Sequence, residues 1–415
     1  MGEVMAFEIL FLLFLFGNAL LIFYFYVRQV RSVKLHRDTV PHVFSDYVSL
    51  SEHQKTSDLC LHEAKVSEIH RITNLVAILL LTYGGVLGWF SSTLLANFGN
   101  GLLTQYFIVF GVLAVFAAID LVFSAFGQNK LAVPGQSSFL KRLVFCTLVP
   151  LAVLPIWMSG SGLWWFWATL AVFGIGLAVH FGFSFNGAAV RPMTNGDLKE
   201  RLQAFQRRIR FESAKLFVDE EKDAKNSEGV QIVGYGFNKK IILSKYVLEH
   251  LSPLEIEALI ANKVCQYKQS HSIRTWTALL IVSFLFFWVL GEVVSKPWFY
   301  EGLGVNGLDK SAYGTAFVLF MISAYVFLSP LIPLRNALSW KRDEKAEENS
   351  VLLVDWNAMI SAIAKETAHR AGSMVPDSMY FKLVSGNPDP MYKIKLIQHL
   401  APRHTRQRDS WLPSA

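Results

Sequence analysis

Three residues in the second half of the chain are spaced like the metal-binding residues of a helix, but their side chains are not the usual metal ligands. The stretch Leu251–His271 has apolar residues at helical spacing, and positions 262 and 266 fall on one face of such a helix. Two histidines there, with a glutamate after the first, form the H-E-x-x-H arrangement that holds zinc and activates water. Here the positions are Asn262, Lys263 and Gln266. Neutral amides are poor zinc ligands and an ammonium group cannot act as a base, so this stretch alone is also consistent with an ordinary amphipathic helix.

The elements that must position these residues begin with the start of the same helix. Ser252 suits the N-cap, Pro253 suits the first helical position, and Glu255 lies three residues after the cap. These residues predict a reciprocally capped helix.

The composition indicates an integral membrane protein. The 415 residues are 53% hydrophobic, 14% aromatic and 17% charged, which is too apolar for an ordinary soluble protein of this length. Runs long enough to cross a hydrocarbon layer of roughly 30 Å predict seven spans, at about 7–27, 74–95, 103–126, 143–158, 163–185, 276–294 and 316–334. The first run has no basic region before it and no small-residue cleavage site, so we interpret it as a retained span.

The distribution of lysine and arginine predicts the orientation. These residues crowd the loops after spans one, three, five and seven, and the loops after spans two and four carry none. By the positive-inside tendency, the N-terminus is outside and the C-terminus is cytoplasmic. The membrane is the inner or plasma membrane if the protein is bacterial, and the endoplasmic reticulum if it is eukaryotic. The net charge of +7 is explained by these loops rather than by nucleic acid.

Several polar residues carry no clear assignment. Cys60, Cys146 and Cys265 are scattered and indicate neither a disulfide framework nor a zinc site. We expect a polar loop at about 28–71, with solvated histidines. Asp120 and His180 fall inside predicted spans, and either structural contacts or a cavity lining would explain them.

The polar regions after spans five and seven predict compact structure. A helix capped by Asn195, a strand at 215–219 and a hairpin over 229–243 follow span five. A helix including Val351 and Ile363 follows span seven.

Ordered motifs along the chain resemble the CAAX prenyl endopeptidases, integral-membrane zinc peptidases that trim prenylated proteins. The zinc helix of that family is roughly E-x-x-A-V-L-A-H-E-x-G-H-W-x-x-x-H, and this chain keeps Glu255, Ala258, Ala261 and His271. Four further stretches are similar to family motifs: FNGAAVRPMTNGDLKERL, GYGFNKKIIL, PLRNALSWKRDEKAEE and GNPDPMYKI.

The resemblance also implies which positions would carry the chemistry, and most are substituted. The two helix ligands fall on Asn262 and Gln266, and the general base falls on Lys263. The remaining family positions are the third ligand, the following acid, the late histidine and its arginine partner, which fall on Asp343, Glu347, Asn387 and Lys393.

The substrate side of the site is altered as well. In the family, the strand that holds the substrate backbone usually carries Asn-Ala. The matching positions of this chain are Gly229 and Val230. His271 lies about 140° around the helix from Gln266 at 3.6 residues per turn. In active members of the family, the histidine at this position is present together with the two zinc-binding histidines. We therefore do not assign His271 as a metal ligand.

The resemblance therefore implies a mostly α integral membrane protein with an interrupted cytoplasmic metallopeptidase-like α+β domain. Its parts are a membrane region at 1–189, the first part of the peptidase-like domain at 190–275, spans six and seven at 276–334, and the second part at 335–415.

Because substitutions coincide at nearly every chemical position, we expect a membrane pseudopeptidase. It would bind no cofactor, and it would bind a membrane protein, a lipid or a lipidated peptide. One alternative is an active zinc metalloendopeptidase with an atypical ligand set, and a further one is a transporter or channel. We expect the lipid bilayer as a partner and no nucleic acid.

Overall fold

The computed structural model describes residues 2–127, 136–185, 190–219, 229–234, 236, 238–269, 272–305, 312–370 and 374–409. In these ranges the helices are α1 Gly2–Leu35, η1 His42–Phe44, α2 Leu50–Leu81, α3 Val86–Phe98, α4 Leu102–Gly127, α5 Gln136–Met158, α6 Trp164–Phe185, α7 Asp197–Arg208, α8 Lys245–His250, α9 Pro253–Gln269, α10 Ser272–Val293, α11 Pro297–Glu301, α12 Tyr313–Leu328, α13 Leu331–Val351, α14 Trp356–His369, α15 Ser378–Tyr380, η2 Phe381–Ser385 and α16 Pro390–Asp409. The strands are β1 Val190–Pro192, β2 Lys215–Asp219, β3 Val230–Val233 and β4 Lys240–Ser244.

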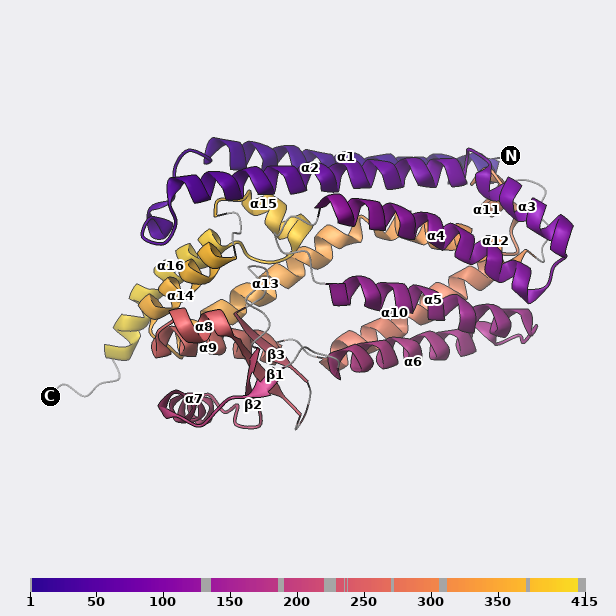
Figure 1. Cartoon of the computed structure of the whole chain (residues 1–415). Helices are drawn as coiled ribbons and strands as arrows, with labels where there is room; N and C mark the ends of the chain where they lie inside the picture. The colour runs from indigo at the N-terminus through magenta and orange to yellow at the C-terminus, as the bar shows by residue number, and fades with distance from the viewer. Residues whose placement is uncertain are drawn as a thin grey trace.

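Long apolar helices run alongside one another through most of the molecule (Figure 1). Within the described residues, four helices are long and apolar enough to cross a membrane, namely α1, α4, α5 and α10. Two bent pairs, α2 with α3 and α12 with α13, each pass the same test together, and the apolar part of α6 is shorter. The chain is thus a multi-pass membrane protein in length and composition, and the number seven stays a prediction.

The segment at 28–71, which we expected to be a polar loop, is largely helical, so that expectation is wrong. Helix α1 continues to Leu35 and α2 begins at Leu50, with Ser49 and Glu52 forming a capping box at its start. The charged residues of this segment had suggested a loop. Some of them form ion pairs with one another instead, as Arg37 does with Asp58 at 2.8 Å.

The histidines of this segment are not all solvated either. His53 is 3% exposed, and its Nε2 lies 2.9 Å from the backbone oxygen of His36. His70 lies on α2 and contacts Asp120, as described below. Sequence spacing did not predict these contacts because they join segments that are distant in the sequence.

A small mixed sheet lies at one end of the long helices (Figure 1). Its strand order is β1-β2-β4-β3. Strands β3 and β4 form the expected antiparallel hairpin, with Val230 opposite Leu243, and β2 joins β4 in parallel. Strand β1 pairs antiparallel with β2 and was not predicted, because three residues ending in proline give too little pattern.

Helix α9 packs against β3, and helices α7 and α14 pack against α9, so that these helices and the sheet share a buried core. That core includes Leu202 from α7, Ile241 from β4, Ile260 from α9 and Ala362 from α14. A second core, with Phe287 and Leu290 among its members, lies between the membrane helices.

Two helix boundaries differ from expectation. Gly196, not Asn195, is the N-cap of α7, and the Asn195 side chain instead accepts a hydrogen bond from Lys199 at 2.8 Å. The helix expected over Val351 and Ile363 is broken between α13 and α14, because the Asp355 side chain caps a new start by accepting from the Ala358 amide.

Candidate functional site

Helix α9 positions the central polar residues, and its start is fixed as the sequence predicted. The Ser252 amide donates to Glu255 Oε2 at 2.6 Å, and the Glu255 amide donates to Ser252 Oγ at 3.4 Å. Burial alone would raise the pKa of Glu255, but hydrogen bonds from Lys365, Ser361 and the Ser252 backbone outweigh it and lower that pKa. The ionised carboxylate therefore ties α9 to α14, and Asn262 lies two turns further along a largely buried helix.

A continuous chain of polar contacts runs from α9 to α13 and α16. Gln266 Nε2 donates to Asn262 Oδ1 at 2.9 Å. Asn262 Nδ2 in turn donates to Glu347 Oε2. Lys393 Nζ lies 3.0 Å from the other carboxylate oxygen, Glu347 Oε1. Three helices thus meet at one fully buried carboxylate.

The charge balance of this cluster is maintained by Lys393. Burial alone would lower the pKa of Lys393, but the adjacent Glu347 carboxylate outweighs burial and raises it, so the ammonium stays charged. The contact of Lys393 Nζ with Glu347 Oε1 is an ion pair inside the protein. The carboxyl of Asp343 lies within electrostatic reach of Lys393, Glu347 and Lys263.

These residues do not fit a zinc ion. Zinc requires lone pairs from imidazole, thiolate or carboxylate, and a catalytic site uses three protein ligands. Here an amide N–H and an ammonium group both face the buried carboxylate. Among the described residues, no group of three or more His, Cys, Asp and Glu side chains could hold a metal ion.

The structure brings together most of the residues singled out from the sequence, with one change of role. Asn262, Gln266, Glu347 and Lys393 are in contact. The acid that contacts Asn262 is Glu347, the expected following acid, which lies one turn after Asp343, the expected third ligand, on α13.

Among the described residues, Asn387 does not join this cluster. Asn387 is exposed in the turn before α16. His271 lies outside the described residues.

Gly229 and Val230 lie at the start of β3, the edge strand beside α9. The Gly229 amide donates to Glu366 Oε1 at 3.0 Å, and its carbonyl accepts from the Ser244 amide at 2.9 Å. A Cβ atom at position 229 would lie 2.6 Å from Val247 Cγ2, so the glycine is required by close packing. Both backbone groups of Gly229 are therefore engaged within the protein.

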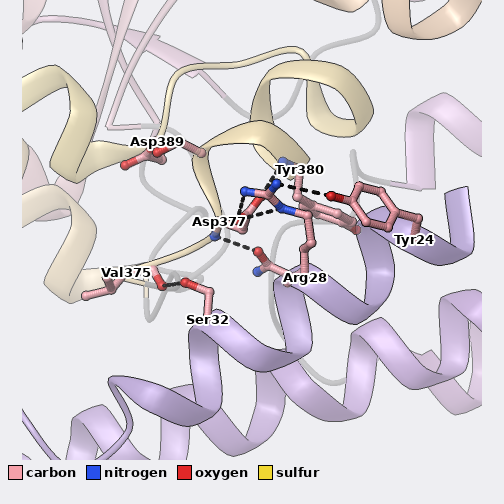
Figure 2. A network of polar contacts seen from close by, with 9 residues as sticks. Tyr24, Arg28, Ser32, Val375, Asp377, Tyr380 and Asp389 are labelled. Carbon is pink, nitrogen blue, oxygen red and sulfur yellow. Dashed lines mark hydrogen bonds and ion pairs between the residues drawn. The ribbon is translucent and has the colours of Figure 1, made fainter. Parts of the chain in front are cut away.

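The segment that leads into α16 is held by polar contacts that sequence analysis missed. Arg28 Nε and Nη2 donate to Asp377 Oδ2 at 3.3 and 3.0 Å, as Figure 2 shows. The Asp377 amide donates to Gln29 Oε1 at 2.8 Å, and Asp377 Oδ1 accepts from the Tyr380 amide. We call these contacts of Arg28, Gln29 and Asp377 the α1 latch.

The same segment is anchored from the side of α13. Asn336 Nδ2 donates to the carbonyls of Leu383 and Val384 at 3.0 and 2.9 Å. Gly386 adopts φ of 79° with the Asn336 side chain about 3.1 Å from where a Cβ would lie. Asp389 then caps α16 by accepting from the Tyr392 amide at 2.8 Å. These contacts fix the direction of the helix that carries Lys393.

The two ionisable residues inside predicted spans have structural partners. Asp120 Oδ1 lies 2.9 Å from His70 Nε2, and Asp120 Oδ2 lies 3.5 Å from Arg142 Nη1. The rings of His180 and Trp276 meet edge to face at 5.1 Å. Each contact joins different helices, which accounts for the residues structurally.

Comparison with known proteins agrees with this architecture. Residues 29–131 match a family model described as the CAAX prenyl protease N-terminal region, with five membrane helices. A CAAX prenyl protease 1 homolog of Arabidopsis thaliana is 22% identical over 345 residues, covering 76% of this chain and 78% of the relative. The homolog of Dictyostelium discoideum is 21% identical over 392 residues, covering 86% and 89%.

The fold is shared with a solved structure. The crystal structure of S. mikatae Ste24p superposes with a TM-score of 0.71 at 16% identity, covering 94% of this chain and 98% of that chain. Together, the family model, the curated relatives and the shared fold support a relationship of this chain to the CAAX prenyl proteases.

Proposed function

We propose that this chain is a catalytically inactive member of the family, a membrane pseudopeptidase that binds a partner instead of cleaving it. The observation that carries the proposal is the polar chain from Gln266 through Asn262 and Glu347 to Lys393. It occupies positions that the family resemblance assigns to metal ligands, a nearby acid and an arginine, and its members contact one another.

Hydrolysis of a peptide at such a site would need an activated water and a proton acceptor beside it. The acceptor position holds Lys263, whose ammonium group has no lone pair to give. The buried carboxylate of Glu347 is not available as a substitute, because Asn262 and Lys393 both contact it. The Lys393 ammonium supplies a positive charge within the cluster without supplying a Lewis acid.

The partner we favour is a membrane-embedded protein or a lipidated peptide. The relatives are named as prenyl proteases, so their fold accepts prenylated chains, and this chain covers most of their length. A chain that keeps this fold but lacks the catalytic residues is consistent with a protein that binds such a partner without cleaving it.

The test is an activity and metal assay on the full-length protein in detergent and in liposomes. A farnesylated peptide ending in a CAAX motif is incubated with excess zinc, with and without a chelator, beside the Arabidopsis homolog as a positive control. We expect no cleavage by this chain and less than stoichiometric zinc by elemental analysis. Chelator-sensitive cleavage would contradict the proposal and favour an active metalloendopeptidase with an atypical ligand set.

A restored-motif variant sharpens the result. The triple change Asn262→His, Lys263→Glu and Gln266→His recreates the helix motif, and we expect it to recover zinc binding more readily than activity. The reason is that Lys393 remains charged beside Glu347, where it repels a cation. Full activity of the triple variant would mean that only the helix residues separate this chain from active relatives.

Binding is tested separately from cleavage. The same farnesylated peptide, fluorescently labelled, is titrated into the wild-type protein, and its unprenylated form is the control. Saturable binding of the prenylated form without cleavage supports the proposal. Equal weak binding of both forms would remove the lipidated peptide as the partner.

A further inference from the structure

The last third of α1 has two faces with different surroundings. Arg28, Gln29 and Ser32 face the 375–380 segment and form the α1 latch and its neighbouring contact with Val375, as Figure 2 shows for the labelled residues. At 100° per residue, positions 27, 30, 31 and 34 fall on the opposite side of the helix. The residues of that outer face take no part in the α1 latch.

The outer face carries a shallow cavity of about 400 Å³. It is lined by Tyr26, Val27, Val30, Arg31, Lys34 and Leu35. We call it the α1 groove. Its walls combine aliphatic and aromatic surface with two cationic side chains, a combination suited to an amphipathic ligand with a negative head.

The two cations of the groove differ from the nearby arginines on and just after α1. Arg28 is paired with Asp377, and Arg37 is paired with Asp58. Arg31 and Lys34 are exposed and have no acidic or hydrogen-bonding partner among the described residues. Their charge is therefore directed outward and available to a ligand.

The groove continues an apolar stripe along the membrane-facing side of α1. Leu13, Leu20 and Val27 are 62%, 69% and 47% exposed and recur every seven residues, so they lie nearly in line with Lys34. Along α1, the exposed apolar residues are therefore followed directly by Arg31 and Lys34, two cations without an acidic partner among the described residues. This order matches the acyl chain and the phosphate of one phospholipid molecule.

We propose that the α1 groove binds an anionic phospholipid, with its acyl chain along Val27 and Val30 and its phosphate between Arg31 and Lys34. A soluble acidic peptide would use the cations but leave the apolar stripe uncovered. A zwitterionic lipid would use the stripe but carries a compensating ammonium in its head. The site is distinct from the polar cluster at Glu347.

The experiment uses the full-length protein, delipidated in dodecyl maltoside and examined by native mass spectrometry. Dioleoyl-phosphatidylglycerol or dioleoyl-phosphatidylcholine is added at matched concentrations, and retained lipid is counted. We expect one phosphatidylglycerol to be retained selectively. The variant Arg31→Gln/Lys34→Gln should bind it about thirtyfold more weakly, since each basic residue at a membrane surface contributes about fivefold.

Two further variants separate lost binding from lost folding. Arg31→Lys/Lys34→Arg keeps both charges and should retain the lipid. Arg207→Gln/Arg210→Gln removes two exposed charges at the end of α7, away from the groove, and should behave as wild type. Equal gel-filtration profiles confirm that the variants are folded.

Several results would overturn the proposal. These are equal retention of the two lipids, retention unchanged in Arg31→Gln/Lys34→Gln, and displacement of the lipid by glycerol phosphate, which lacks acyl chains. Retention of an acidic decapeptide instead of phosphatidylglycerol would assign the groove to a protein partner and contradict the lipid.

Discussion

Glu347 is the residue on which the polar contacts of the site converge, and its ion pair gives the most local prediction. Its side chain is fully buried, and Lys393 lies 3.0 Å from it. Removing one partner of a buried pair leaves an uncompensated charge, which typically costs about 3–5 kcal/mol. We expect Lys393→Met to lower the unfolding free energy toward the low end of this range, because the lysine side chain is 22% exposed.

Matched variants test that explanation by chemical denaturation in detergent. Lys395→Met removes an exposed lysine from the same helix and should change the unfolding free energy by less than about 0.5 kcal/mol. Glu347→Gln combined with Lys393→Met removes both charges and should recover most of the loss. A double variant as unstable as Lys393→Met alone would show that packing, not charge, accounts for the effect.

At this scale the sequence singled out residues that the structure brings into contact, but it did not predict the contacts themselves. The H-E-x-x-H spacing correctly drew attention to Asn262 and Gln266, because helical periodicity alone puts them on one face. Which acid meets Asn262 depends on side-chain length and on the packing of α13 against α9. The partnership of Arg28 with Asp377 joins residues 349 apart, and nothing in local spacing signals it.

At the scale of elements, the close packing of β3 against α8 predicts a steric coupling. Gly229→Ala would place its Cβ 2.6 Å from Val247 Cγ2, and overpacking of this kind costs about 1–3 kcal/mol. Val247→Ala should make room for the new methyl group. We therefore expect the double variant to be more stable than the sum of the single effects by about 1 kcal/mol, measured as a denaturation cycle. Additive effects would show that the strand shifts freely.

The α1 latch makes a second prediction about an element, the 374–385 segment. Asp377 caps α15 and accepts from Arg28, so Asp377→Ala removes a cap worth about 1 kcal/mol as well as a partly exposed ion pair. Deuterium exchange in this segment should rise by roughly fivefold or more for such a loss. Asp377→Asn keeps a capping oxygen and should show a smaller rise. Unchanged exchange in Asp377→Ala would mean that Asn336 alone holds the segment.

Local signals predicted the elements that have strong ones and failed for those that depend on tertiary pairing. The Ser252–Glu255 cap and the β3–β4 hairpin are present as expected. The first part of α2 was missed because its polar residues resemble those of a loop until their partners in the turn after α1 and on α4 are known. Strand β1 exists only because β2 lies beside it.

At the scale of the whole molecule, the N-terminus and α3 lie at one end of the long helices, while the sheet, α14 and the C-terminal helix lie at the other (Figure 1). Hydropathy predicts the membrane helices well, because spanning segments need long apolar runs. It defines their number less well where a helix bends, as between α12 and α13, which meet at 54°.

The orientation across the membrane is the last prediction, and it is tested by cysteine labelling. The native Cys60, Cys146 and Cys265 are first replaced by serine, and single cysteines are introduced at Asn97 and Lys341. Basic loops follow the odd-numbered predicted spans, so we expect Asn97→Cys to react with an impermeant maleimide from outside and Lys341→Cys to react only after permeabilisation. Both residues are exposed: Asn97 lies in the last turn of α3 and Lys341 lies on the polar part of α13. Labelling of both positions from the same side would contradict the topology, and reversed labelling would place the polar cluster at Glu347 outside the cell or in the lumen.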